Sequence, residues 1–138
     1  MADGISLASG VVALTTFAFQ STKVLHELIE SYRNKTRAVR ELRDELEALE
    51  AVLKSLQGIL SDPDVDLSAL ELPLLRCGEA CGGFAKTIEK CTARSSTDKT
   101  SFRDWLLLTY RGRDIASFRN IIGAYKSTIT IALADANM

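Results

Sequence analysis

Apolar side chains recur every three or four positions along most of the chain, which is the spacing of one buried helix face. The clearest run belongs to a predicted helix ending near residue 60, and its members are Val39, Leu42, Leu46, Leu49, Leu53, Leu56 and Leu60. An earlier run with the same spacing comprises Leu7, Val11, Leu14, Ala18, Ser21, Leu25, Leu28 and Tyr32. Together they predict a long N-terminal helix, a break around residues 34–36, and a second helix.

Three further helical segments follow. The first carries Leu74, Cys77, Cys81, Phe84, Ile88 and Cys91, and the last carries Ile115, Phe118, Ile122, Tyr125 and Ile129. A short helix over residues 102–110 is predicted between them. Residues 128–133 favour a strand locally, but no second strand is available to pair with them, so we assign them to the last helix. The pattern predicts an all-α fold, an antiparallel helical bundle of four to five helices with a long N-terminal helix, in a single domain over residues 1–138.

Charge is segregated along the chain, although the net charge is only -1. Residues 4–22 carry no charge, residues 23–40 carry five basic and two acidic side chains, and residues 41–71 carry two basic and nine acidic ones. We expect some of these charges to pair along a helix, for example Arg37 with Glu41 and Glu50 with Lys54. The near-neutral total argues against nucleic acid as a partner, and 46% hydrophobic residues argue against disorder.

The uncharged N-terminal segment has two interpretations. It lacks the basic start of a secretory signal, and its serines and threonines make it only a marginal membrane span. The first interpretation is a core helix of a soluble bundle. The second is a helix that leaves the bundle and enters a bilayer, and the cluster Arg33, Lys35, Arg37, Arg40 and Arg43 is then read as a contact for anionic headgroups rather than only a solubilising helix start.

No arrangement of reactive side chains predicts an enzyme, a metal site or a cofactor. Cys91 lies too far along the helix from Cys77 and Cys81 to share a tetrahedral site with them, so we expect buried free thiols. His26 has no nucleophile motif to serve, and we expect it at the edge of the bundle. The glycines in residues 78–83 form no phosphate loop, and we interpret them as points of close helix approach.

Three stretches carry a resemblance to a known family: residues 1–14 (MADGISLASGVVAL), 21–25 (STKVL) and 39–49 (VRELRDELEAL). They resemble the N-terminal domain of fungal STAND proteins, the HeLo-like domain of NOD-like receptors. That domain is similar to the helical bundles of the fungal incompatibility prion protein, of mixed lineage kinase domain-like proteins and of plant cell-death proteins. The resemblance extends more loosely through residues 77–84 and 125–133.

The resemblance implies a membrane-targeting effector of programmed cell death and heterokaryon incompatibility. Such a domain is cytoplasmic at rest, is activated by an upstream nucleotide-binding receptor module, self-associates, and moves to the plasma membrane, where its N-terminal helix permeabilises anionic lipid. The membrane-inserting residues would be Ile5, Leu7, Val11, Val12, Leu14, Phe17 and Phe19. The headgroup contacts would be Lys23, Arg33, Lys35, Arg37 and Arg40. The alternative is a helical signalling adaptor or oligomerisation module that recruits a partner without membrane insertion.

Overall fold

The computed structural model describes residues 2–31, 37–60, 66–93 and 112–136. They form α1 (Ala2–Glu30), α2 (Arg37–Ile59), the 3-10 turn η1 (Ser68–Leu70), α3 (Glu71–Ala93) and α5 (Gly112–Ala136). These ranges contain no strand, and residues 128–133 are helical, so the all-α prediction is confirmed. The short helix predicted over residues 102–110 lies outside the described residues.

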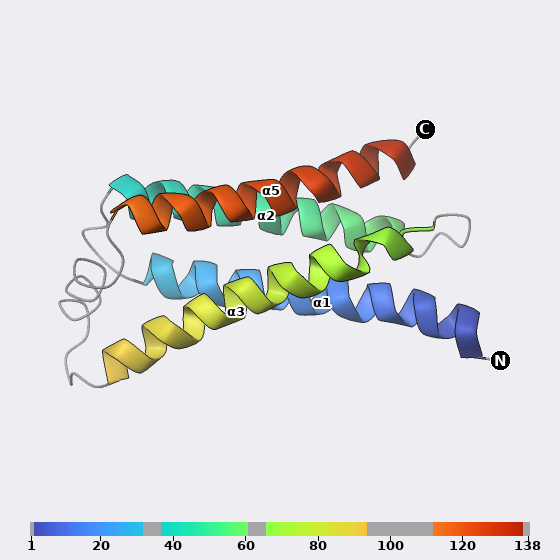
Figure 1. Cartoon of the computed structure of the whole chain (residues 1–138), viewed down its shortest axis with the longest axis horizontal. Coiled ribbons are helices and arrows are strands. Elements are labelled where there is room, and N and C mark those ends of the chain that lie inside the picture. The colour runs from blue at the N-terminus through green and yellow to red at the C-terminus, as the bar shows by residue number, and fades with distance from the viewer. Residues whose placement is uncertain (1, 32–36, 61–65, 94–111, 137–138) are drawn as a thin grey trace.

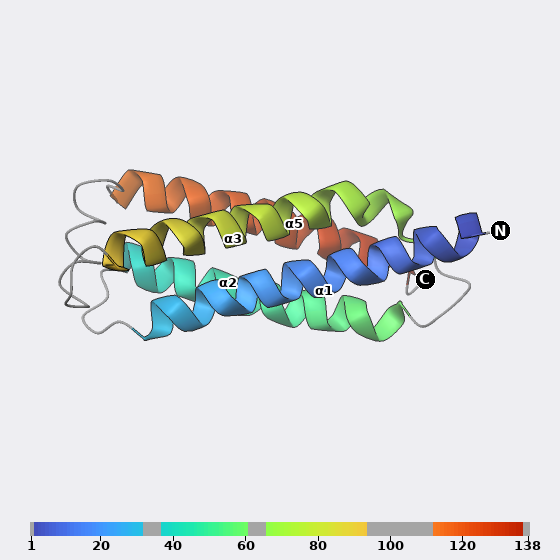
Figure 2. The ribbon, with the colours of Figure 1, turned by 90° about the horizontal axis from the view of Figure 1, so that it is seen from below.

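The four α-helices pack as two layers, with α1 beside α3 in one layer and α2 beside α5 in the other (Figures 1 and 2). Helices that follow each other along the chain run in opposite directions (Figure 1). Within each layer, however, the two helices run in the same direction. Both chain ends therefore lie at one end of the bundle, and the first turns of α1 extend beyond the ends of the other helices in both views.

The core is built around α2, whose apolar stripe faces the other helices over its whole length. All but the last member of the predicted stripe are buried: Val39, Leu42, Leu46, Leu49, Leu53 and Leu56. Leu60, at the end of the helix, is half-buried. Because each buried leucine contributes about 1.5–3 kcal/mol relative to exposure, this stripe supplies much of the stability of the bundle.

Ion pairs tie α2 to α5 and fix the register of that layer. Arg119 Nη1 lies 3.4 Å from Glu41 Oε1, and the Lys126 ammonium contacts the Glu45 carboxylate. Glu41 also pairs with Arg37 at 3.8 Å, which confirms the predicted pair within α2. Each of these pairs is partly exposed and contributes at most about 1 kcal/mol, so their main effect is on register.

Glycines of α3 let α1 approach closely, as the sequence predicted. A Cβ added to Gly78 would lie 2.3 Å from Cε2 of Phe17, so the phenyl ring occupies the space that a side chain would need. A Cβ at Gly82 would meet the Ser21 hydroxyl at 3.9 Å, whereas a Cβ at Gly83 would meet nothing within 4 Å. Two of the three glycines therefore face α1, and Gly83 faces away from it.

Candidate functional site

The outer face of the α1–α3 layer exposes more apolar surface than a solvated helix needs. On α1, Val12 is 45% exposed, Phe17 39% and Val24 49%. Leu72 and Leu75 of α3 are exposed as well. Since α1 carries no charged residue between Asp3 and Lys23, the outward side of α1 over this stretch is as free of charge as its inward side. A helix that is uncharged on all sides is usually covered on all sides in its working state.

A groove of about 280 Å³ runs along this face between α1 and α3. Phe17 and Val24 form its apolar side, and Gly82 and Ala85 form a floor in which small residues leave room. Lys86 and Glu89 of α3 add one charge of each sign to the lining. The groove is suited to an apolar side chain from another molecule.

The two buried polar side chains of α1 are satisfied within α1 itself. The Thr15 hydroxyl donates to the Val11 carbonyl at 2.7 Å, and the Thr22 hydroxyl donates to the Ala18 carbonyl at 2.7 Å. Thr22 also lies 3.6 Å from the Cys81 sulfur, which is a weak contact at most. Separation of α1 from α3 would therefore leave neither hydroxyl without a hydrogen-bond partner.

The structure divides the predicted membrane-inserting residues among different faces. Val11 is buried in the core, while Leu14 and Phe19 are half-buried and pack against it. Val12 and Phe17 are the exposed members. Ile5 and Leu7 lie on the described backbone of α1, but their side chains lie outside the described part of the chain. The seven residues do not form one surface while α1 is docked.

The predicted headgroup residues that the structure describes differ in how near they lie to that apolar surface. Lys23 and Arg40 are exposed, and Arg37 is exposed and paired with Glu41. Arg33 and Lys35 lie outside the described residues. Arg37 begins α2 at the end of the bundle opposite the N-terminus of α1 (Figure 1). Arg37 is thus separated from Val12 and Phe17 along the long axis of the molecule, whereas Lys23 directly precedes the exposed Val24.

Polar contacts join α1 to α2 only near the C-terminal end of α1, within the part of the chain that the structure describes. Nδ1 of His26 pairs with the carboxylate of Glu50, and Arg43 Nε lies 3.7 Å from Glu30 Oε2. With Glu47, these residues line a cavity of about 360 Å³. His26 therefore lies at the bundle edge as predicted, but Glu50 pairs across the helices with His26, whereas the sequence predicted Lys54 as its partner.

Cys77 and Cys81 are buried free thiols in the core, as expected from their place on the apolar stripe. Interaction with the neighbouring Cys81, together with burial, raises the pKa of the Cys77 thiol. That thiol is accordingly protonated at neutral pH and a poor nucleophile. The side chain of Cys91 lies outside the described residues.

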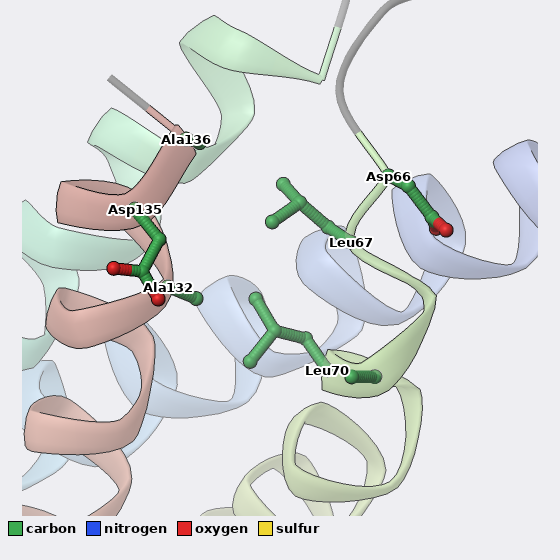
Figure 3. A pocket seen from close by; sticks show the side chains of 7 residues that line it. Asp66, Leu67, Leu70, Ala132, Asp135 and Ala136 are labelled. Carbon is green, nitrogen blue, oxygen red and sulfur yellow. The ribbon is translucent and has the colours of Figure 1, made fainter. Parts of the chain in front are cut away.

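A cavity of about 420 Å³, which no sequence pattern predicted, lies at the end of the bundle where α5 finishes. Leu67 and Leu70 point toward α5, where Ala132 faces them, and Asp66 and Asp135 lie on opposite sides (Figure 3). The carboxylates of Asp66 and Asp135 are turned away from the two leucines (Figure 3), so the leucines and Ala132 form an apolar floor. Its lining comes from two segments far apart in the chain, and only the fold brings them together.

Two properties limit what the described residues can do alone. No helix among them is both long enough and apolar enough to cross a membrane. Across the same ranges, no group of three or more His, Cys, Asp or Glu side chains is arranged to hold a metal ion.

Comparison with known proteins identifies the family but not the activity. A family model described as pigment biosynthesis cluster protein PigL N-terminal matches residues 2–138. The family is of fungal type, in agreement with the coarser part of the resemblance; its description names no receptor and no cell-death domain, so the HeLo-like assignment stays a prediction. No curated protein and no solved structure matches the chain. The match spans nearly the whole sequence, and the chain therefore belongs to the PigL N-terminal family of pigment biosynthesis cluster proteins.

Proposed function

We propose that this domain is a membrane-targeting effector of cell death, related to the HeLo-like domains, in which α1 is held in the bundle at rest and is released to act on a membrane. The observation that carries the proposal is the character of α1. It has no charged residue between Asp3 and Lys23, it exposes Val12 and Phe17, and its buried hydroxyls bond to its own backbone. Such a helix is compatible with both the bundle core and an apolar environment.

The resting position of α1 needs a trigger to change. Release up to Thr22 would expose Val11 and Ala18 fully, and Leu14 and Phe19 in part. The apolar burial lost by α1 alone amounts to about 5 kcal/mol, and the residues of α3 that it covers add to this cost. The released form is therefore less than about one molecule in several thousand in solution. Clustering by an upstream nucleotide-binding receptor module, or a bilayer that accepts the apolar surface, would shift this equilibrium.

The released helix is proposed to lie along the membrane surface rather than to span it. No described helix meets the requirements for spanning. Val12 and Lys23 are separated by about 17 Å along α1. A released segment lying flat brings its exposed apolar residues and Lys23, just beyond Thr22, to the same bilayer surface. Several such helices in an oligomer would disrupt the lipid packing of a cytoplasmic membrane face.

The polar contacts near the end of α1 set how far release extends. His26 and Glu30 pair with residues of α2, whereas the stretch from Gly10 to Thr22 makes only apolar contacts and one weak hydroxyl–sulfur contact with other helices. We therefore propose that the first two-thirds of α1 separates while the last turns stay on α2. Residues near Thr22 then act as the hinge.

Leakage of anionic vesicles tests the proposal. The variant Val12→Glu places a charge on the exposed face of α1, where it does not disturb the core, and we expect it to abolish or strongly reduce leakage. Val11 is unsuitable for this purpose, because it is buried and a glutamate there would unfold the bundle. The matched control is Ile131→Glu, which introduces the same charge at an exposed position of α5 and should leak like the wild type. Undiminished leakage by a folded Val12→Glu variant would refute the role of α1.

The α1–α3 groove favours a second function, that of an adaptor which recruits a partner helix without touching lipid. Its apolar lining from Phe17 and Val24 is typical of grooves that accept a helix. Cosedimentation with vesicles separates the two functions. Absence from the vesicle pellet at every lipid composition and every oligomeric state would favour the adaptor.

A further inference from the structure

The outward face of α3 carries charged residues in an order that would match opposite charges on a second copy of α3 running in the reverse direction. Arg76, Glu79, Lys86 and Glu89 are all exposed and alternate between positive and negative. The midpoint between Glu79 and Lys86 is also the midpoint between Arg76 and Glu89, and it lies between Gly82 and Gly83. A second α3 laid antiparallel across this midpoint brings Glu79 against Lys86 of the copy and Lys86 against its Glu79. Arg76 and Glu89 lie about 140° apart around the helix, with Glu89 in the groove beside α1, and they flank this contact on opposite edges.

The midpoint is also the place where a second helix can come closest. A Cβ at Gly83 would meet no atom of its own chain within 4 Å, so this position is open to the outside. Gly82 beside it has only the Ser21 hydroxyl nearby, at 3.9 Å. Glycines at a crossing point let two helix backbones approach and pack through their ridges and grooves. The ion pairs on either side then fix the orientation.

Apolar surface suitable for burial adjoins this crossing. Phe17 and Val24 of α1 are exposed on one side of α3, and Leu75 is exposed on α3 itself. The α1–α3 layer has an outer face that no other described helix covers (Figure 2), and the three exposed side chains belong to its two helices. An interface centred on α3 would have an apolar interior and a charged rim, which is the usual composition of a specific contact.

We propose that the chain forms a two-fold dimer through the outward face of α3, crossing at Gly82 and Gly83. The partner is a second copy because only a copy supplies the same charges in reversed order, as an isologous interface requires. Both signs occur among the described charged side chains of this face, as pairing with a copy requires. The proposed function includes an oligomerisation step, and this interface supplies the surface for it. To that extent the role of the dimer rests on the proposed function. Release of α1 leaves Glu79, Gly83 and Lys86 in place.

A charge-swap series measured by analytical ultracentrifugation tests the pairing. Glu79→Lys and Lys86→Glu each place like charges opposite one another at two symmetric positions. We expect each to weaken the dimer by on the order of tenfold, because two exposed pairs are lost at once. The double variant Glu79→Lys/Lys86→Glu restores opposite charges and should recover the wild-type dissociation constant. The control is Lys54→Glu, at an exposed position of α2, which should leave association unchanged.

Two glycine-to-leucine variants, one at the crossing point and one elsewhere, test the close approach of the helices without a clash inside the bundle. Gly83→Leu fills open space on the chain's own surface and replaces glycine within a helix, so the thermal unfolding midpoint should rise while the dimer is lost. Gly58→Leu on α2 also meets no atom within 4 Å and should remain dimeric. A wild-type chain that is monomeric at every concentration, a dimer that survives Gly83→Leu, or a charge swap that fails to restore association would each overturn the proposal.

Ultracentrifugation is done without lipid, so the dimer and the membrane function can fail separately. A monomeric chain whose α1 still permeabilises vesicles overturns the dimer and leaves the effector function standing. A dimer with the predicted charge-swap behaviour that never permeabilises vesicles supports the interface and contradicts the effector function.

Discussion

Gly78→Ala tests the contact that positions α1 on α3. In an exposed helix this substitution stabilises by about 0.5–1 kcal/mol, because alanine loses less backbone entropy on folding. Here the new methyl group would lie 2.3 Å from Cε2 and 2.5 Å from Cδ2 of Phe17, well inside van der Waals contact. The ring has to swing out, and overpacking of this kind costs about 1–3 kcal/mol.

The matched control is Gly83→Ala on the same helix, compared at a concentration where both proteins are monomeric; the methyl group there meets nothing within 4 Å, and only the helix-forming gain remains. We therefore expect the Gly78→Ala protein to be less stable than the Gly83→Ala protein by about 1–3 kcal/mol. Urea unfolding followed by circular dichroism measures both. Adding Phe17→Ala should remove the penalty, because it removes the clashing ring. If Gly78→Ala stabilises the protein as much as Gly83→Ala does, the close α1–α3 contact described above is wrong.

Three other predictions concern the core, the thiols and the acid side of the stability profile. Leu49→Ala should lower the free energy of unfolding by about 2–5 kcal/mol in urea titration, because the side chain is fully buried; a loss below about 1 kcal/mol would contradict that placement. Cys77 and Cys81 should resist alkylation until the bundle unfolds, as followed by mass spectrometry, since both are buried; rapid labelling of the folded protein would show that the core opens. Asp66 accepts a hydrogen bond from the Ser68 backbone N–H at 3.1 Å, which holds its pKa below the ordinary value. The stabilisation by Asp66 is therefore present above the unfolded-state pKa of about 4 and is lost as the pH falls through the lower folded-state pKa, and Asp66→Asn should abolish this part of the acid dependence.

Helix positions could be predicted from periodicity because packing repeats with the helical turn. The stripe from Val39 to Leu56 is buried at every predicted position, and Ile115, Ile122 and Ile129 are buried on α5. The same period applied to α1 identified Val11, Ala18 and Leu25 as inward-facing, which the structure confirms.

The pairing of the helices could not be predicted in this way. Glycines at positions 78 and 82 indicated close approach, but only the fold shows that the partner is α1, which runs parallel to α3 within one layer. Likewise, the spacing within α2 predicted an ion pair between Glu50 and Lys54. In the structure Glu50 pairs with His26, because α1 packs antiparallel to α2 and places His26 opposite Glu50. Contacts between elements depend on rotations about each helix axis that a periodic pattern does not specify.

The candidate site could be predicted only in part for the same reason, because a periodic pattern does not specify which side of a helix is covered. Absence of charge from residues 4–22 correctly marked α1 as unusual, but the proposed inserting residues were selected for hydrophobicity, and hydrophobicity does not distinguish the buried Val11 from the exposed Val12. The cavity beside Asp66 and Asp135 had no sequence signal, since its lining residues are distant in the chain.

The central claim is that α1 must separate from α3 to act on a membrane, and a reversible cross-link tests it most directly. The variant Gly10→Cys/Glu71→Cys places a thiol on each helix at the end of the released segment farthest from the hinge, where a Cβ at Gly10 lies 3.1 Å from Oε1 and 4.0 Å from Cδ of Glu71, within reach of a disulfide after a small adjustment. Gly10→Cys alone, oxidised in the same way, is the control. We predict that the oxidised double variant binds vesicles without leakage, and that reduction restores leakage to the level of the control. Equal leakage from the oxidised and reduced double variant, with the cross-link verified by mass spectrometry, would contradict the release of α1.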